Sequence, residues 1–298
     1  MRFAADVPTV SVIIPTYNRK ALVLEALESV FVQTYRDYEV VLVDDGSTDG
    51  TQTAVASLGN GIRYLYQENA GEARARNYGL SAARGDIVAF LDSDDQWTPE
   101  LLESEVGILK SHPEVALACA RALTSGRKSK RFAPQQEVLT GDLFPLLFQT
   151  NFVNNSTVVA RRSCLAEAGG FNEAYLTYYD YDLWLRIASR YPLAYVGRYL
   201  AYCGRGGDNL SKDTSRSREA ILEILRKNYD PSRIDSAAYH RRVANCCLAV
   251  GRAFLAQGEY DRAWSFFLKA RDLTPYRLRP YRYLTKAVFR SIKPSRRF

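Results

Sequence analysis

Histidine and paired cysteines are scarce in this sequence. The chain of 298 residues contains 2 histidines, and its 5 cysteines include no two spaced as CxxC. A structural zinc site needs four such ligands at short spacings, so the composition argues against one. An odd number of cysteines also argues against a disulfide framework and favours reduced thiols. We therefore expect a cytoplasmic protein.

Long apolar runs are also missing. No stretch approaches the roughly 18 to 20 consecutive apolar residues that a membrane-spanning helix needs. No apolar segment precedes Pro8, so we expect no secretory signal. With 47% apolar and 12% aromatic residues the chain can still bury a sizeable core. Its length favours one large domain with an appendage.

Acidic residues are absent from the C-terminal end. The formal net charge is +7, and from Arg277 onward there are eight basic residues and no acidic one. The rest of the chain is close to neutral, whereas a nucleic-acid-binding protein spreads positive charge over a folded face. We therefore expect no nucleic-acid partner. A cationic end suits an anionic membrane surface, and a solvated tail without a partner is the alternative.

Short β-rich runs alternate with helical stretches in the first half of the chain. The runs are 10–14, 38–43, 62–66 and 86–91, and helical spacing occupies 21–33, 51–58 and 72–83. This alternation predicts an α/β fold with a mostly parallel sheet flanked by helices. Ligands of such sheets bind beyond the carboxyl ends of the strands, where polar clusters follow three of these runs.

The second half has a different pattern. Strands are predicted at 155–160, 193–196 and 199–203, and a helix at 180–189. From Ser215 onward the pattern is almost wholly helical, with breaks at Pro231 and Pro275. We place a domain boundary at 211, so that residues 1–211 form the α/β domain and 212–298 form a helical C-terminal extension.

Three carboxylates lie together after the fourth predicted strand, at Asp92, Asp94 and Asp95. They repel one another unless a cation neutralises them, and carboxylate oxygens suit Mg²⁺ or Mn²⁺ shared with substrate phosphates. The alternative is that Asp94 or Asp95 caps the helix expected near Pro99. Capping explains one carboxylate and not three, so the sequence favours a metal site.

Two polar segments follow earlier strands. Asp44 and Asp45 can form a turn, or they can accept hydrogen bonds from a nucleobase or a ribose. Tyr17, two residues after Pro15, can form one wall of a base-binding slot or be a core aromatic. Spacing alone leaves these alternatives open and favours the turn for the two aspartates.

Four segments occur in an order that is specific in combination. They are SVIIPTYNR from Ser11, VVLVDDGSTDGT from Val40, NAGEARARNYGL from Asn69 and FLDSDD from Phe90. Together they resemble the family 2 inverting glycosyltransferases with the GT-A fold. GGFNEAY from Gly169 and YDLWLR from Tyr181 extend the resemblance, which covers residues 8 to about 211.

The resemblance implies a role for each matching residue. The nucleotide-binding positions are Pro15, Tyr17, Asp44, Asp45, Arg76, Asp92 and Ser93. Asp92 and Asp94 match the DxD motif of the family, with Asp94 as the more direct ligand of Mn²⁺ or Mg²⁺. The metal bridges the diphosphate and stabilises negative charge on the leaving group.

The resemblance also implies a general base. The family usually carries an acidic residue followed by Asp at the start of the helix that continues as YDLWLR. Asp180 keeps the base position, whereas Tyr179 replaces the usual first acid. The alternative is that Asp180 merely caps this helix. We expect Asp182 and Arg186 to pair along the helix and Trp184 to lie in the core.

A second departure follows at Arg205. Relatives often carry a histidine shortly before an NLS segment, whereas this chain has CGRGGDNLS from Cys203. Arg205 is a candidate for contacting the diphosphate as a cation, without coordinating metal. The glycines around it suggest a loop that closes over the donor.

The C-terminal segment resembles one tetratricopeptide repeat, over residues 244–277. Small and aromatic residues recur in its order and spacing: Gly251, Phe254, Gly258, Tyr260, Ala263, Phe267, Ala270 and Pro275. One repeat cannot form a solenoid by itself. It is expected to pack on the catalytic domain or on a second copy in a homodimer, and a helical hairpin without a partner is the alternative.

These features predict a metal-dependent inverting glycosyltransferase. Its donor is a nucleotide diphosphate sugar, with a UDP-sugar favoured, and its acceptor is a saccharide or a lipid-linked intermediate. The resemblance suggests bacterial surface polysaccharide synthesis, and the basic tail suggests a peripheral position on the inner face of the cell membrane. A nucleotidyltransferase is one alternative, although PTYNR is not the Gly-rich basic loop it needs. A catalytically weak relative that acts as a binding or scaffold protein is the other.

Overall fold

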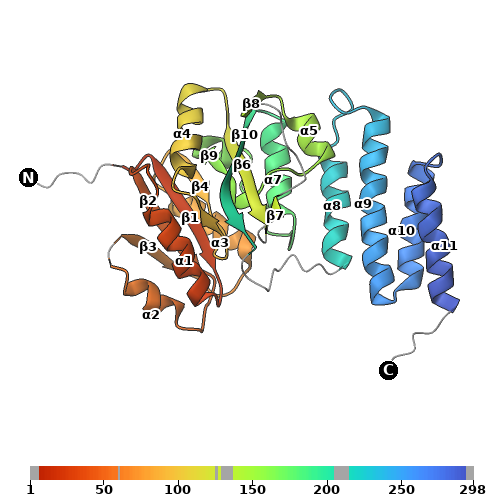
Figure 1. Ribbon diagram of the computed structural model, residues 1–298, viewed down its shortest axis with the longest axis horizontal. Helices are drawn as coiled ribbons and strands as arrows, with labels where there is room; N and C mark the ends of the chain where they lie inside the picture. Colours follow the sequence, from red (N-terminus) through yellow and green to blue (C-terminus); the bar gives the residue numbers. More distant parts are fainter. Residues whose placement is uncertain (1–6, 60, 125–126, 129–136, 205–214, 293–298) are drawn as a thin grey trace, which may run out of the picture. The chain divides into compact units, whose positions relative to one another are not determined.

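The computed structural model describes residues 7–59, 61–124, 127–128, 137–204 and 215–292. The chain forms two compact units, Met1–Asn209 and Leu210–Phe298 (Figure 1). The domain boundary predicted at 211 lies outside the described residues.

A mixed sheet forms the centre of the first unit. Its strands are β1 (Val10–Thr16), β2 (Tyr38–Asp44), β3 (Ile62–Tyr66), β4 (Ile87–Phe90), β5 (Gln96–Trp97), β6 (Leu117–Thr124), β7 (Arg127–Lys128), β8 (Val138–Gly141), β9 (Val159–Arg161) and β10 (Leu193–Cys203). The main order is β3-β2-β1-β4-β9-β6-β10-β5. The first four strands are parallel, and β9 is antiparallel to both β4 and β6. The predicted α/β fold is confirmed, with the parallel strands concentrated in the N-terminal half.

Helices cover both faces of the parallel part. The helices described in the first unit are α1 (Lys20–Phe31), α2 (Thr51–Ala56), α3 (Glu72–Ala82), α4 (Leu101–Ser111), α5 (Phe144–Gln149), α6 (Arg162–Glu167) and α7 (Tyr179–Ala188). Apolar residues of α1 and α4 pack with Val12 and Leu42 on one face. On the other face Gly79 of α3 lies against Ile13, where a Cβ atom would be 2.5 Å from that side chain. Burial on both faces explains why the strands are continuously apolar.

Two predictions for the second half of this unit are wrong in detail. The segment predicted as a strand at 155–160 begins with a short 3₁₀ helix, Asn155–Thr157, and only then enters β9. The side chain of Asn154 accepts a hydrogen bond from the Ser156 backbone N–H, which favours the turn over an extended strand. The two strands predicted between 193 and 203 are one strand, β10, with a register shift between Val196 and Tyr199.

The second unit is helical. It contains α8 (Ser215–Lys227), α9 (Ser236–Gln257), α10 (Tyr260–Leu273) and α11 (Leu278–Ile292). Gly251 of α9 lies against the Phe267 ring of α10, where a Cβ atom would be only 2.5 Å from the ring. Gly258 ends α9 in the left-handed region at φ 81°, which glycine adopts without strain. The helical extension is confirmed, and its identity as a tetratricopeptide-like repeat stays a prediction.

The apolar side of α11 packs inside the second unit. Leu284 and Ala287 are buried in one core with residues of α9 and α10. Tyr283 stacks on Phe267, with 5.3 Å between the ring centroids. No helix among the described residues is both long and apolar enough to cross a bilayer.

Candidate active site

The loops that follow β1 and β2 are joined by hydrogen bonds. The Asn18 backbone N–H donates to Ser47 Oγ at 2.9 Å, and Asn18 Oδ1 accepts from the Thr48 N–H at 2.7 Å. Pro15 is buried at the end of β1, whereas the Tyr17 side chain is 46% exposed and is therefore not a core aromatic. Asn18 has a φ of 49°, unusual for a residue other than glycine and typical of functional loops.

Asp44 and Asp45 are both buried and both form hydrogen bonds within the protein. Asp44 accepts hydrogen bonds from the Ser47 N–H, at 2.7 Å, and from the Tyr64 hydroxyl. Asp45 accepts from the side chain of Gln67 and from the backbone N–H groups of Ala70 and Gly71, at 2.6 to 3.0 Å. The turn interpretation of Asp44 is therefore correct, and Asp45 fixes the segment that leads into α3.

A buried arginine contacts the acidic cluster. The Arg76 side chain is 1% exposed, and its Nη2 atom lies 3.0 Å from Glu72 Oε1 and 2.5 Å from Asp92 Oδ1. Its Nη1 atom donates to the Tyr179 hydroxyl at 2.6 Å. A guanidinium this deeply buried is stable only because carboxylates surround it. Arg76 therefore orients Asp92, and the nearby charges keep its own pKa well above the ordinary value.

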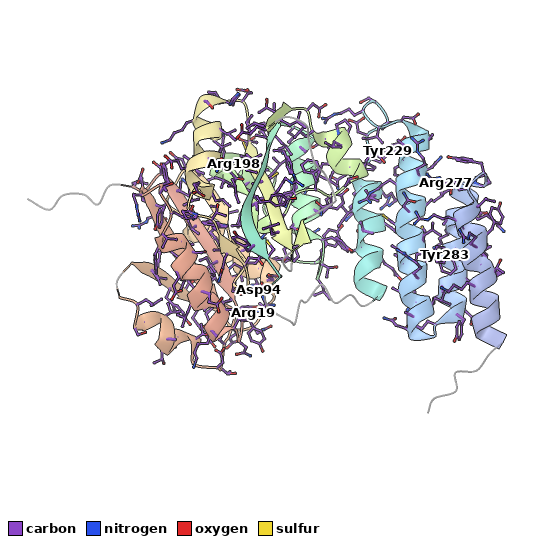
Figure 2. All side chains as sticks on the ribbon, in the orientation of Figure 1. Arg19, Asp94, Arg198, Tyr229, Arg277 and Tyr283 are labelled. Atoms are coloured by element: carbon purple, nitrogen blue, oxygen red, sulfur yellow. The ribbon has the colours of Figure 1, made fainter. Side chains whose placement is uncertain are left out.

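The three aspartates after β4 have separate environments. Asp92 Oδ1 also accepts from the Asn155 amide at 2.8 Å, and Asp94 forms an ion pair with Arg19 at 2.9 Å (Figure 2). Asp95 accepts from the Ser156 hydroxyl at 2.5 Å and from the Gly204 N–H at 2.8 Å. Burial raises the pKa of Asp94, and burial beside Asp92 raises the pKa of Asp95 to about 7.

The capping alternative for this cluster is wrong. The helix α4 begins at Leu101 after Glu100, and no side chain caps it. Asp94 is also 8% exposed, so it is a buried group and not a surface carboxylate. Ser93, between the two predicted ligands, is buried as well.

The cluster suits a divalent cation shared with a diphosphate. Asp92 is 27% exposed, and the hydrogen bonds that its carboxylate accepts from Arg76 and Asn155 both go to Oδ1. The buried Asn155 Oδ1 is unpaired in the same part of the structure. No group of three or more acidic, histidine or cysteine side chains converges on one point within the described ranges. Asp92 and Asp94 would therefore supply at most two ligands, which is typical of Mg²⁺ sites completed by substrate phosphates and water.

Asp180 is the second residue of α7, directly after Tyr179. The N-cap position of this helix is Tyr178, so Asp180 lies in the first turn and not at the cap. Its charge interacts with those of Arg76, Asp92 and Glu72, and burial raises its pKa to about 6. Tyr178, which precedes the helix, has a φ of 61°, a strained value for tyrosine. Arg76, which bonds to both Tyr179 and Asp92, connects the start of α7 to the acidic cluster.

The other predictions for this region have clear outcomes. Asp182 and Arg186 pair at 2.8 Å along α7, as expected. Trp184 is fully buried, with its ring centroid 6.0 Å from that of Phe90, so it is a core residue. Arg205 lies outside the described residues.

Three residues of the site were missed by the sequence analysis. Arg19 belongs to a quoted motif, but nothing in its spacing pointed to Asp94. Glu72 lies four residues before Arg76, which was predicted, and this spacing on a helix favours an ion pair that could have revealed Glu72. Asn155 had no signal, because its segment was predicted to be a strand.

A family model for glycosyl transferase family 2 matches residues 11–185. The chain belongs to glycosyl transferase family 2. The resemblance inferred from the four motifs is thereby confirmed, and family membership argues against the nucleotidyltransferase alternative.

Curated relatives support the same family. A glycosyltransferase of Rickettsia typhi is 34% identical over 195 residues, which is 62% of this chain and 61% of the relative. The amylovoran biosynthesis glycosyltransferase AmsE of Erwinia amylovora is 31% identical over 209 residues, covering 68% of this chain and 78% of AmsE. The chain spans about three fifths of the length of two Rickettsia relatives, at 61% and 58%.

Solved structures share the fold. Residues 1–349 of TarS from S. aureus give a TM-score of 0.71 at 18% identity, over 97% of this chain and 93% of that one. The mannosyltransferase PcManGT of Pyrobaculum calidifontis, in complex with GDP-Man and Mn²⁺, gives 0.61 at 22% identity, over 97% and 88%. At these identities the similarity concerns the fold alone, and it confirms the predicted GT-A type.

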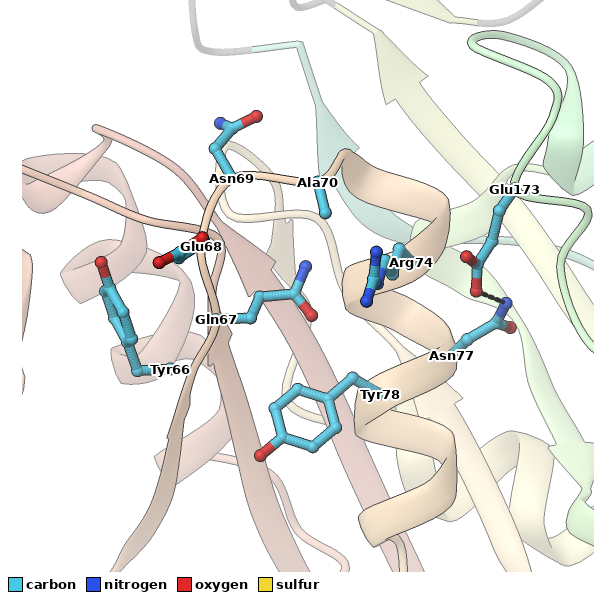
Figure 3. Close-up of a pocket in the computed structure, with 9 residues that line it drawn as sticks. All are labelled: Tyr66, Gln67, Glu68, Asn69, Ala70, Arg74, Asn77, Tyr78 and Glu173. Atoms are coloured by element: carbon cyan, nitrogen blue, oxygen red, sulfur yellow. Dashed lines mark hydrogen bonds between the residues drawn. The ribbon is translucent and has the colours of Figure 1, made fainter.

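A separate pocket of about 650 Å³ lies beside α3 (Figure 3). It is lined by Tyr66, Gln67, Glu68, Asn69, Ala70, Arg74, Asn77, Tyr78 and Glu173. Arg74 and Arg76 are two residues apart on a helix and so point to opposite sides. Arg74 lines this pocket whereas Arg76 bonds to Asp92, and Asp45 bonds to two of the lining residues, Gln67 and Ala70.

Proposed function

We propose that this member of glycosyl transferase family 2 is a metal-dependent inverting enzyme that transfers a sugar from a nucleoside diphosphate sugar to an acceptor hydroxyl. One observation carries the proposal. The buried Arg76 bonds both to Asp92 of the acidic cluster and to Tyr179, the residue before Asp180. One guanidinium thus links a candidate metal ligand to the residue that precedes the candidate base.

The chemistry assigned to the site is a single displacement. Asp180 takes the proton of the acceptor hydroxyl as that oxygen bonds to the anomeric carbon, and the bond to the diphosphate breaks on the opposite face. The raised pKa of Asp180 makes it a stronger base than an ordinary aspartate. Asp92 and Asp94 would hold Mn²⁺ or Mg²⁺, which stabilises negative charge on the leaving diphosphate.

The donor is proposed to bind across the loops after β1 and β2. Tyr17 offers an exposed ring in the loop after β1, and Pro15, Asp44 and Ser93 are further positions that the family resemblance assigns to the nucleotide. The TarS structures include complexes with UDP and with UDP-GlcNAc, and PcManGT is in complex with GDP-Man. These complexes support a nucleotide sugar, and we favour a UDP-sugar. Arg205 stays a candidate for the diphosphate.

The acceptor is proposed to be a saccharide or a lipid-linked saccharide. AmsE is named for amylovoran biosynthesis, and TuaG of Bacillus subtilis, 36% identical over 146 residues, for teichuronic acid biosynthesis, although that match covers only 45% of this chain and 56% of TuaG. We therefore place this protein in bacterial surface polysaccharide synthesis, in the cytoplasm. Its basic C-terminal helix is proposed to hold it peripherally on the membrane, and the helical unit is a candidate for homodimer contact.

Donor turnover tests the metal site. Hydrolysis of UDP-sugars and GDP-mannose is measured with Mn²⁺ and with excess chelator, in wild type and in Asp94→Asn. We expect chelation to abolish turnover and Asp94→Asn to lower it at least about 100-fold, because the amide is a poorer ligand for a hard cation. The thermal unfolding midpoint is recorded for each variant.

Asp86→Asn is the matched control, since its carboxylate is 96% exposed and it lies before β4. It should behave like wild type in both assays. Normal turnover of Asp94→Asn in excess chelator would show that the metal assignment is wrong. Absence of turnover with every donor would instead favour the binding or scaffold alternative.

A further inference from the structure

Tyr179 belongs to a closed ring of hydrogen bonds. Its hydroxyl donates to Glu72 Oε2 at 2.5 Å and accepts from Arg76 Nη1 at 2.6 Å. Arg76 Nη2 completes the ring by donating to Glu72 Oε1 at 3.0 Å. All three side chains come from the first turns of α3 and α7.

This ring has one connection to the acidic cluster. The same Arg76 Nη2 atom also donates to Asp92 Oδ1, at 2.5 Å. The two N–H bonds of this nitrogen therefore serve two different carboxylates, those of Glu72 and Asp92. Because the Tyr179 hydroxyl occupies Glu72 Oε2, Glu72 is left with a single oxygen for Arg76.

Loss of the hydroxyl would change this balance. A carboxylate with both oxygens available prefers two parallel bonds to a guanidinium. Arg76 would then rotate to direct one N–H of each terminal nitrogen at Glu72, and this rotation would turn the second N–H of Nη2 away from Asp92, to which it makes the shortest hydrogen bond of that carboxylate. The Asn155 amide alone would still hold the Asp92 carboxylate.

Two aromatic rings stack near the guanidinium of Arg76. Its guanidinium carbon lies 5.2 Å from the centroid of the Tyr179 ring and 5.9 Å from that of Phe171. Its Nε atom has no partner among the described residues. The two terminal nitrogens therefore provide its hydrogen bonds, and the direction of those bonds depends on Glu72 and Tyr179.

We propose that Tyr179 and Glu72 are positioning residues that direct Arg76, and through it the Asp92 carboxylate, toward the metal–diphosphate group of the donor. The inference rests on the proposed function. It assigns a positioning role to Tyr179, the residue that stands where the family usually carries an acidic side chain.

Nucleotide binding tests the role without relying on turnover. The Kd of UDP and of GDP is measured by calorimetry with and without Mn²⁺, in wild type and in Tyr179→Phe. We expect the variant to weaken Mn²⁺-dependent binding about tenfold, as for other residues that orient metal ligands. Binding without Mn²⁺ should change by less than about twofold, because the base-binding loops are untouched.

Tyr181→Phe is the matched control. Tyr181 is a buried tyrosine of the same helix whose hydroxyl donates to the Leu147 and Phe148 carbonyls. Both variants lose a buried hydroxyl and should lower the thermal unfolding midpoint. Only Tyr179→Phe should raise the Kd of the nucleotide measured with Mn²⁺. Equal effects of the two variants on this Kd would show that Tyr179 is merely structural.

A double-mutant cycle tests whether Tyr179 acts through Glu72. In a Glu72→Gln background the carboxylate that Tyr179 directs is already gone, so Tyr179→Phe should raise the Kd measured with Mn²⁺ by less than about twofold. A full tenfold rise of this Kd in that background would show that Tyr179 does not act through Glu72. Failure of the wild type to bind either nucleotide with Mn²⁺ would overturn the proposed function itself, and this inference with it.

Discussion

Among single residues, Asp180 has the most direct consequence for pH dependence. Burial raises the pKa of its carboxyl to about 6, and the charges of Asp92 and Glu72 act in the same direction. A general base works only when it is deprotonated, so its activity is lost as the pH falls through this value. An aspartate with an ordinary pKa of about 3.9 would show no such loss above pH 5.

We therefore predict that kcat/KM rises about tenfold per pH unit below pH 6 and levels off above it. The measurement is donor turnover with saturating Mn²⁺ between pH 5 and 8. Asp180→Asn should lower kcat by about 100-fold or more and remove this rise, while leaving the Kd of the nucleotide within about twofold. An unchanged pH profile in that variant would assign the titration to another group.

The residues of the site differ in how far their roles follow from sequence. Asp92 and Asp94 were predictable because three adjacent carboxylates need a reason to be together. The ring of Glu72, Arg76 and Tyr179 was not, since its hydrogen bonds join residues that are 103 and 107 positions apart. Nothing local to either segment specifies which side chains meet.

Among the elements, α4 carries a buried acidic side chain that no motif indicates. Glu105 is fully buried on this helix, and neither carboxylate oxygen has a partner within the described residues. Burial raises its pKa well above the ordinary value, so the folded protein holds this proton to a higher pH than the unfolded chain does. The surrounding helix positions, such as Val106 and Leu109, belong to the apolar core.

This arrangement predicts that stability falls with rising pH. The unfolded chain ionises Glu105 near pH 4.5 whereas the folded chain does not, so the free energy of unfolding decreases by about 1.4 kcal/mol per pH unit until the folded-state pKa is reached. Glu105→Leu should remove this contribution. Its gain in thermal unfolding midpoint over wild type should grow between pH 5 and pH 8.

Glu114→Leu serves as the control, because Glu114 is an exposed acid just beyond the same helix. The difference between its thermal unfolding midpoint and that of wild type should stay constant across that pH range. A constant difference in midpoint for Glu105→Leu as well would mean that Glu105 is ionised in the folded protein, against the burial argument.

The elements themselves were predicted best where one pattern dominates. The parallel strands and α1 to α3 agree with prediction to within two residues at most ends, because continuous apolar runs and helical spacing rarely occur by chance. The turn at Asn155 overrode a β-rich composition through a local side-chain hydrogen bond. The C-terminal end was predicted from its charge alone, and periodicity cannot tell whether α9 and α10 or a membrane will cover the apolar side of α11.

At the scale of the whole molecule, the C-terminal unit carries a surface of mixed basic and apolar character. Tyr276, Leu278 and Tyr281 are 69%, 78% and 42% exposed. Arg279, Arg282 and Lys286 are exposed on the same helix. The apolar residues near the start of α11, and not Leu284 or Ala287, are therefore the ones free to enter a membrane interface.

The last prediction is that the protein binds anionic vesicles through the start of α11. Each basic residue near such a surface contributes about 1 kcal/mol, and exposed aromatic and aliphatic side chains add apolar burial at the interface. Full-length protein should float with vesicles that contain phosphatidylglycerol at low salt. It should separate from them at about 0.5 M salt, because the charges are then screened over a few ångströms.

Two variants distinguish this surface from a nonspecific one. Leu278→Ser with Tyr281→Ser should reduce flotation at least about fivefold, since the apolar contribution is removed while the charge is kept. Trp264→Ser is the control, because Trp264 is 38% exposed on α10, outside the basic helix. Equal flotation of both variants at low salt would mean that charge alone binds the vesicles. Failure of the wild type to float would leave the basic residues solvated, without a membrane partner.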